Sequence, residues 1–257
     1  MNFLLSKQII SVVVVYILTA GNVAQSEVTS RVGWVQMNEA PYQASLWFRG
    51  DYMCDGVIVS PKTILTIAQC VMGITPEYYP DYKVRAGTRC VRAGGEVYTV
   101  AGIYTHPNYT FSNSGLSDND FAIIRLKKPM LMNEARQAIA IAKENPPVNA
   151  KGFLVGWGRN HLQDISINFL RKAESTVVSR SFCQEKVHKP LHANVICTYD
   201  RGDPEKCVGN AGSPLVYDNK LVGLLTWNGD CGKVYPAVFA AVSQYRIFIN
   251  RIMLQDS

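Results

Sequence analysis

Apolar residues along this chain fall into short runs that are separated by glycine, proline and asparagine. Several of these runs alternate apolar with polar positions, which is the pattern of a strand with one buried face. We expect strands at Gln43–Phe48, Cys54–Ser60, Tyr82–Gly87, Val97–His106, Phe121–Leu126, Lys151–Gly158, Asn194–Tyr199, Ser213–Trp227 and Ala237–Val242. Many short strands joined by turn residues indicate an all-β sandwich or barrel rather than alternating strands and helices.

Three local patterns add detail to this outline. Asp218-Asn219-Lys220 separates two apolar runs inside Ser213–Trp227, which predicts a tight hairpin between antiparallel strands. Near the C-terminus, apolar residues recur at helical spacing and predict an amphipathic helix at about 244–254 that packs on the β body. The polar, proline-bearing stretch Glu144–Ala150 is the best candidate for a linker between two halves.

The first 24 residues differ in character from the rest of the chain. Lys7 precedes an apolar run, Ile9–Leu18, and small residues follow up to Ala24. The run is too short to cross a bilayer, so it predicts a secretory signal peptide cleaved between Ala20 and Gln25, with a signal anchor as the alternative. No second apolar run of spanning length follows, so we expect a secreted, extracellular protein without a membrane span.

Composition excludes disorder and argues against a nucleic-acid partner. Of the 257 residues, 47% are hydrophobic and 18% are charged, which suits a folded globular protein. Removing residues 1–24 takes away Lys7 and no acidic residue, so the formal charge of +6 falls by one. The surplus contains no block of lysine or arginine, so we expect no nucleic-acid partner.

Seven cysteines in a secreted chain suggest three disulfides and one remaining thiol, and the residues alone leave their pairing open. The tripeptide Asn108-Tyr109-Thr110 is an N-glycosylation sequon, which has meaning because the chain is expected to enter the secretory pathway. Both features fit an extracellular glycoprotein with disulfide bonds.

Four motifs follow one another along the chain: Thr66-Ile67-Ala68-Gln69-Cys70, Asp118-Asn119-Asp120-Phe121-Ala122, Gly156-Trp157-Gly158 and Cys207-Val208-Gly209-Asn210-Ala211-Gly212-Ser213-Pro214. In order and separation they resemble the trypsin and chymotrypsin family of serine proteases, from about Pro41 to the C-terminal helix. The resemblance implies two antiparallel β-barrels with an active site in the crevice between them. The first barrel would span about 29–145 and the second about 146–243, followed by the helix.

The resemblance also implies a disulfide pattern. Three pairs match the family, namely Cys54–Cys70, Cys183–Cys197 and Cys207–Cys231. Cys90 is left without a partner, so it is either a buried free thiol or the site of an intermolecular bridge that would give a disulfide-linked dimer.

Each member of the family's catalytic triad has a matching position here. The family's chemistry needs a serine nucleophile, a histidine base and an aspartate that orients the histidine. Gln69 stands at the histidine position and Ala211 at the serine position, and neither an amide nor a methyl group can do that work. Asp120 matches the aspartate. We therefore predict a degenerate triad and a chain that is not an enzyme.

The residues that remain at these positions are expected to serve the fold. A buried Asp120 needs hydrogen-bond donors, and the Gln69 amide or the Thr226 hydroxyl could supply them. Gly209 matches the glycine whose backbone N–H helps to bind the oxyanion, although a donor without a nucleophile gives little turnover.

No other residue is expected to take over the chemistry. Ser213 lies two positions after Ala211, where the family has glycine, and a shift of that size removes its hydroxyl from attacking distance. The histidines lie outside the family's catalytic motif and are expected to be surface or structural residues: His106, His161, His188 and His192.

The positions that govern activation in the family also differ. Arg31-Val32-Gly33-Trp34 is a poor and shortened match to the N-terminus that cleavage frees in the family. Asn210 replaces the aspartate that pairs with this terminus. A neutral acceptor loses the charge-assisted part of the bond, so we expect the activation ion pair to be absent or much weakened.

The specificity pocket is expected to be altered as well. Glu205 stands at the base of the pocket, where it could meet a basic side chain or be a solvated acid. Asn228 and Ala237 replace glycines that keep the pocket open in trypsin-like enzymes, so their side chains should narrow it. Trp227 matches an aromatic residue of the cleft wall, with packing as its expected role.

These expectations point to binding rather than catalysis. We expect a secreted, non-catalytic protease homologue that acts as a cofactor, decoy or regulator of extracellular proteolysis, with active proteases or zymogens among its partners. The alternatives are an adhesive or carrier protein on the same scaffold and a residual serine-type endopeptidase. No cofactor and no metal are expected.

Overall fold

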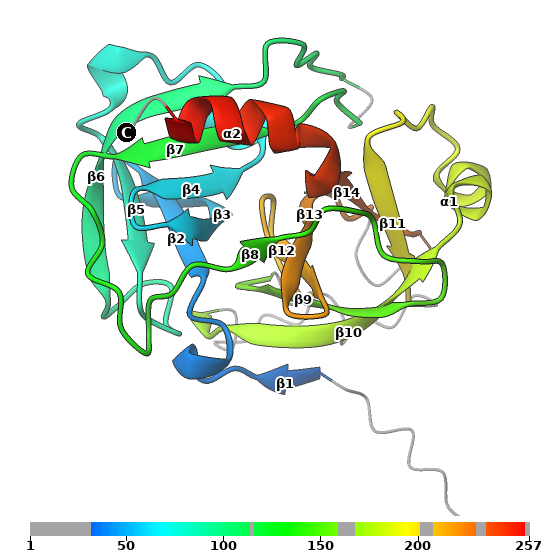
Figure 1. The fold of residues 1–257 in the computed structure, drawn as a ribbon, viewed down its shortest axis with the longest axis horizontal. Helices are drawn as coiled ribbons and strands as arrows, with labels where there is room; N and C mark the ends of the chain where they lie inside the picture. The colour runs from blue at the N-terminus through cyan, green and yellow to red at the C-terminus, as the bar shows by residue number, and fades with distance from the viewer. Residues whose placement is uncertain (1–31, 114–115, 159–167, 201–207, 230–234, 255–257) are drawn as a thin grey trace, which may run out of the picture.

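The computed structural model describes residues 32–113, 116–158, 168–200, 208–229 and 235–254. Their strands form two antiparallel β-barrels, one from each half of the chain, which lie next to each other (Figure 1). A short helix ends the chain. The predicted all-β fold with two barrels and a C-terminal helix is confirmed.

The first barrel is closed and contains six strands: β2 (Gln43–Phe48), β3 (Asp51–Ser60), β4 (Thr63–Thr66), β5 (Tyr82–Ala86), β6 (Glu96–Thr105) and β7 (Ala122–Leu126). Their order is β2-β3-β4-β7-β6-β5, and β5 pairs with β2 to complete the ring. In β5, Tyr82, Val84 and Ala86 are buried, so the alternating residues Lys83 and Arg85 face outward and are partly exposed.

The second barrel also contains six strands: β9 (Lys151–Gly156), β10 (Arg171–Val178), β11 (Val195–Tyr199), β12 (Pro214–Tyr217), β13 (Lys220–Trp227) and β14 (Ala237–Ala241). Their order is β10-β11-β14-β13-β12-β9, and β9 pairs with β10 to close it. Two short strands join this barrel from outside, because β1 (Val32–Trp34) pairs with β10 and β8 (Ala140–Ile141) pairs with β13. The expected first barrel began at about residue 29, whereas Val32–Trp34 belongs with the second.

Every predicted strand overlaps an observed one, but four strands have no counterpart in the prediction: the short outer strands β1 and β8, and the barrel strands β4 and β10. The inward face of β10 carries Ala173, Ser175 and Val177, which are too small or too polar to form an apolar stripe. All four residues of β4 are buried, so β4 lacks the alternation that marks a strand with one exposed face. Both strands depend on partners that lie far away in the sequence.

The helices are short. They are α1 (Arg180–Val187) and α2 (Arg246–Leu254), together with single 3-10 turns at Met37–Glu39, Ala68–Val71, Pro76–Tyr78 and Val242–Tyr245. Helix α2 leaves the second barrel and lies across the first, as Figure 1 shows. Tyr245 stacks on Phe121 with ring centroids 4.3 Å apart, and the Arg125 guanidinium donates to the Ile252 carbonyl at 2.7 Å. The end of the chain therefore ties the two barrels together.

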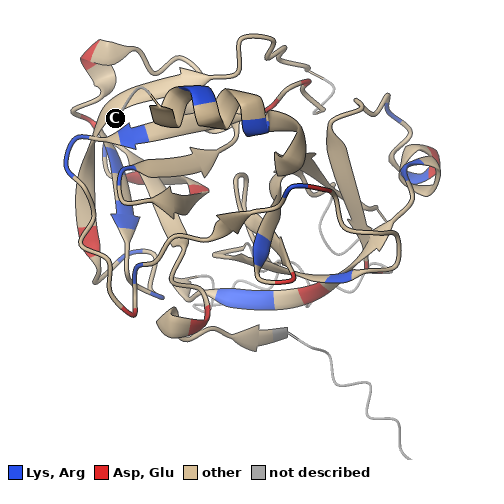
Figure 2. Ribbon diagram, in the orientation of Figure 1, with Lys and Arg blue, Asp and Glu red and all other residues tan. Residues whose placement is uncertain are grey.

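Charged residues are spread over both barrels without a large region of one sign, and β10 carries basic and acidic residues side by side (Figure 2). Among the described residues, no helix has the length and apolar character needed to cross a membrane.

The predicted hairpin joins β12 to β13 through Asp218 and Asn219, which have φ angles of 51° and 54°. Positive φ at both central residues is the geometry of a type I′ turn, in which glycine is favoured at the second position.

We expect Asn219→Gly to raise the free energy of unfolding by about 0.5 kcal/mol. Urea denaturation measures the change. Lys220→Gly, at the first residue of β13, is the control and should lower stability; equal effects of the two substitutions would contradict the assignment.

Candidate active site

The triad positions meet where the second barrel contacts strand β3. The Ala211 carbonyl accepts a hydrogen bond from the Asp55 backbone N–H at 2.8 Å. Asp55 follows Cys54, which is joined by a disulfide to Cys70, and Cys70 follows Gln69 in the 3-10 turn. The candidate active site therefore lies at this contact between the barrels, here called the crevice, with Gln69 in the first barrel's half of the chain and Ala211 in the second's.

Gln69 and Asp120 are bound to each other directly. The Gln69 side-chain amide donates to one carboxylate oxygen at 2.6 Å, and its backbone N–H donates to the other at 2.9 Å. Thr226 was the alternative donor, but its hydroxyl donates to the Val238 carbonyl at 3.0 Å, so that part of the expectation is wrong. The Gln69 amide thus satisfies the aspartate on its own side of the crevice.

Burial controls the ionisation of Asp120. The residue is 2% exposed, and loss of solvation raises its pKa to about 6. Hydrogen bonds from Gln69 and from the Ala68 backbone oppose this rise because they stabilise the charged form. Desolvation wins, because neutral donors do not replace the favourable field that a cationic partner would supply.

A methyl group stands at the nucleophile position. Ala211 is half-buried and packs against the apolar cluster of the first barrel. Glycines on both sides shape the loop, since Gly209 and Gly212 have φ angles of 88° and 83°. A Cβ atom on Gly212 would lie 2.1 Å from the Asp55 carbonyl oxygen, so only glycine allows this approach of the second barrel to β3.

Ser213 lies in a buried polar cluster where the two barrels meet. Its side chain is fully buried, its hydroxyl donates to the Asp55 carboxylate, and it accepts from the Asn210 N–H at 2.8 Å. On the other side of the same carboxylate, the Tyr52 hydroxyl donates at 2.5 Å. The Ser213 hydroxyl therefore fixes the loop and does not point toward a substrate.

Asp55 is the site residue that the sequence pattern misses. It is an acidic residue of β3, and such a residue normally faces solvent, yet its exposed fraction is 0%. Burial raises the pKa of Asp55 to about 7, while the hydroxyls of Ser213 and Tyr52 and the backbone N–H groups of Trp157 and Asn210 work in the opposite direction. The one available signal was Ser213, a hydroxyl at a position where the resemblance expects glycine.

Among the described residues, the two segments that govern activation in the family form hydrogen bonds to different partners. Val32, Gly33 and Trp34 form β1 and pair with β10. The side-chain amide of Asn210 lies 3.5 Å from the Met53 carbonyl and also hydrogen bonds to Tyr52. Arg31 lies outside the described residues.

Residues of the expected specificity pocket are described only in part. Glu205 lies outside the described residues, whereas Asn228 and Ala237 are half-buried. Trp227 is also half-buried; its ring lies edge-on to Tyr235 with centroids 6.2 Å apart. The Lys189 ammonium lies 5.3 Å from the same indole ring. Packing is thus the observed role of Trp227.

The side-chain contacts of the histidines that the structure describes are made with residues other than Gln69, Asp120 and Ala211. His106 packs against the rings of Tyr245 and Phe248, and burial lowers its pKa. His188 ends α1 with a φ of 54°, and His192 lies 3.4 Å from Asp118. His161 lies outside the described residues.

The remaining predicted sites have these positions. The structure contains the disulfides Cys54–Cys70 and Cys183–Cys197, while Cys207 and Cys231 lie outside the described residues. Cys90 is half-buried and free. Asn108 is exposed, as an acceptor of a glycan has to be.

Comparison with known proteins identifies the family. The family model described as Trypsin matches residues 32–249. The chain belongs to the trypsin family. Vitellin-degrading protease from Bombyx mori is 30% identical over 223 residues, which cover 84% of this chain and 82% of that protein. Trypsin epsilon from Drosophila erecta is 31% identical over 216 residues, which cover 82% of each.

Solved structures have the same fold. Neuropsin, a serine protease expressed in the limbic system of mouse brain, matches with a TM-score of 0.77 at 26% identity, over 87% of this chain and 99% of that one. A scabies mite inactivated protease paralogue matches with a TM-score of 0.75 at 22% identity, over 86% and 96%. At that identity the second likeness shows the fold alone.

The relatives correct one sequence-based conclusion. The chain was predicted not to be an enzyme, but the similar proteins are named as proteases, including the two above and hypodermin-A from Hypoderma lineatum, which is 30% identical over 225 residues. That prediction is wrong on this comparison. Gln69 and Ala211 define the chemical groups at two positions, and these groups are not themselves a measurement of activity.

The pair formed by Gln69 and Asp120 predicts a stability effect. Gln69→Ala removes the side-chain donor from a buried carboxylate, which should lower the free energy of unfolding by about 1–3 kcal/mol at neutral pH. The loss should be smaller below the pKa of Asp120, about 6, because the neutral acid needs the donor less. Denaturant unfolding at neutral pH and at a pH below the pKa of Asp120 measures the loss of stability. The exposed Gln137→Ala is the control, and equal losses in the two variants would refute the interaction.

Asp55 predicts a pH dependence of stability. Its pKa is about 7 in the folded protein against an ordinary 3.8, so the folded state holds a proton that the unfolded state releases. Stability should therefore fall as pH rises between about 4 and 7. Between pH 6 and 7, above the pKa of Asp120, Asp55 should account for a fall of about 1 kcal/mol.

Thermal and urea unfolding of the native protein and Asp55→Asn across this range measure that effect. The difference between the two proteins isolates Asp55 from His106, whose lowered pKa acts in the opposite direction. A difference that stays constant from pH 5 to 8 would show that Asp55 does not titrate in this range.

Proposed function

We propose that this member of the trypsin family is secreted after loss of residues 1–24 and acts by binding another extracellular protein, as a cofactor, decoy or regulator of proteolysis. Its partner would be an active protease or a zymogen. The proposal concerns how the mature chain, residues 25–257, acts on other proteins.

The observation that carries this proposal is the state of the crevice. The two barrels, the Cys54–Cys70 disulfide and the loop glycines Gly209 and Gly212 are present. Within that framework, the Gln69 amide is bound to Asp120 and a methyl group stands at residue 211. A framework that is kept while its reactive groups differ supports a role in which the surface of the fold recognises a partner.

The test is capture from the native secretion. Purified secreted protein is coupled to a resin and incubated with the fluid in which it occurs, and the bound proteins are identified by mass spectrometry. The control is the same protein after reduction and alkylation, which breaks the fold but keeps the composition. Specific recovery of a protease or zymogen is expected. Recovery of receptors or cell-surface glycoproteins instead would favour the adhesive role.

Peptide hydrolysis is the second candidate, and the names of the relatives favour it. The same preparation is incubated with peptide libraries, and cleavage is compared with that of Ala211→Val, whose larger side chain crowds the crevice. Cleavage that persists through purification and disappears in this variant would support an endopeptidase and contradict a role limited to binding. Capture of a partner without such cleavage would support the proposed function.

A further inference from the structure

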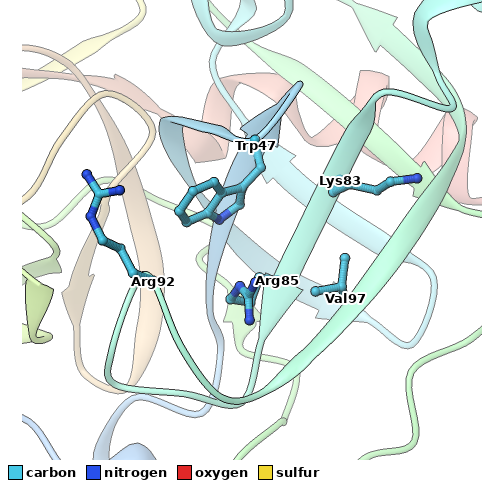
Figure 3. A pocket seen from close by; sticks show the side chains of 6 residues that line it. Trp47, Lys83, Arg85, Arg92 and Val97 are labelled. Carbon is cyan, nitrogen blue, oxygen red and sulfur yellow. The ribbon is translucent and has the colours of Figure 1, made fainter.

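A hollow of about 360 Å³ lies on the outside of the first barrel, away from the residues of the crevice. Trp47, Gly50, Lys83, Arg85, Arg92 and Val97 line it. They come from β2, the turn that follows it, β5, the loop before β6, and β6 itself. Figure 3 shows the indole of Trp47 in the middle of this basic hollow, with the side chains of the three cations around it.

Strand pairing explains why these side chains gather. Trp47 lies opposite Lys83 across β2 and β5, and Arg85 lies opposite Val97 across β5 and β6. Residues directly opposite each other project on the same face of a sheet, and residues two apart in one strand share that face. The outer face of three neighbouring strands therefore presents two cations, an aromatic ring and an aliphatic side chain together.

The lining of the hollow contains three cations and no acidic side chain. Among the described residues, none of its three cations forms an ion pair with a carboxylate. Of the acids closest along the chain, Asp81 pairs with Arg49 and Glu96 pairs with Arg136, while the exposed Asp51, which follows Gly50, forms no ion pair with the three cations. A concave surface that carries one sign of charge attracts a ligand of the opposite sign.

Arg85 is held in place but not saturated. Its guanidinium donates to the Gly94 carbonyl at 2.7 Å and lies 5.7 Å from the centre of the Trp47 ring. Its Nε is buried and has no hydrogen-bond partner within the described part of the chain. The side chain as a whole is partly exposed, so a carboxylate that reaches its other N–H groups would give this cation an ion pair.

The walls of the hollow are apolar as well as basic. Val97 is 50% exposed, and Trp47 is half-buried, so both offer apolar surface beside the cations. A sulfated polysaccharide would use the charges and leave this surface unused. A peptide segment that carries both acidic and apolar side chains would use both, because interface recognition combines buried apolar anchors with paired charges.

We propose that the basic hollow binds an acidic segment of a partner protein that also carries an apolar anchor side chain. The inference rests on the proposed function only in that the occupant is a protein, and it names the chemistry of the segment that is recognised. The carboxylates would meet Lys83, Arg85 and Arg92, and the apolar side chain would lie against Trp47 and Val97.

Fluorescence anisotropy with synthetic peptides tests the proposal on the purified secreted protein. The probe is the labelled peptide Glu-Leu-Glu-Glu-Phe-Glu. One control peptide has glutamine in place of every glutamate, and the other has serine in place of leucine and phenylalanine. The probe should bind at least about tenfold more tightly than either control, because each control lacks one of the two contacts.

Matched variants locate the binding. The triple variant Lys83→Gln, Arg85→Gln, Arg92→Gln should weaken binding of the probe by about tenfold or more. The charge-matched control Lys128→Gln, Arg246→Gln, Arg251→Gln changes residues outside the hollow and should leave the affinity within about twofold. Val97→Ser, at an exposed position, should weaken binding without changing the charge.

Three results would overturn the proposal. These are equal binding of the glutamine peptide, equal weakening by the two triple variants, and heparin binding that is stronger than that of the probe and unaffected by Val97→Ser. The peptide measurements and the capture experiment can succeed or fail independently of each other. Failure of the peptide to bind removes the hollow as a recognition site but leaves a partner at the crevice possible, and recovery of no partner leaves the peptide measurements intact.

Discussion

The crevice of this protein depends on one buried carboxylate. Asp55 projects from the first barrel, and the Ser213 hydroxyl of the second barrel donates to it, while its own backbone N–H donates to Ala211. These contacts hold the loop that carries the nucleophile position against β3. Because the carboxylate is fully buried, each donor around it offsets part of a large desolvation cost, so the loop has little freedom to move away.

Asp120 presents the same physical problem on the other side of the crevice, with a similar solution. It too is buried, its pKa is also raised, and its partners are the neutral amides of Gln69 and Ala68. The site is thus organised around two desolvated acids whose partners are neutral donors. Such an arrangement fixes geometry well, since hydrogen bonds are directional.

The sequence predicts the parts of this structure that leave a local pattern. β2 has the predicted bounds because apolar and polar residues alternate clearly, and Gln69 was named as a donor to Asp120 because the motifs set both positions. β10 was missed because its inward face is small and polar. Asp55 was missed because a buried acid in a strand looks like a solvent-facing one until its distant partner is known. Activity was judged from two positions, and the relatives overturned that judgement.

Hydrogen exchange of single backbone amides tests most directly whether the Asp55 contacts hold the crevice together. The Asn210 amide donates to the Ser213 hydroxyl and the Asp55 amide donates to Ala211, whereas the Gln69 amide donates to Asp120. Ser213→Ala should speed exchange at Asn210 and Asp55 by about tenfold and leave Gln69 unchanged. Unchanged rates at Asn210 and Asp55, or an equal increase at Gln69, would contradict this account.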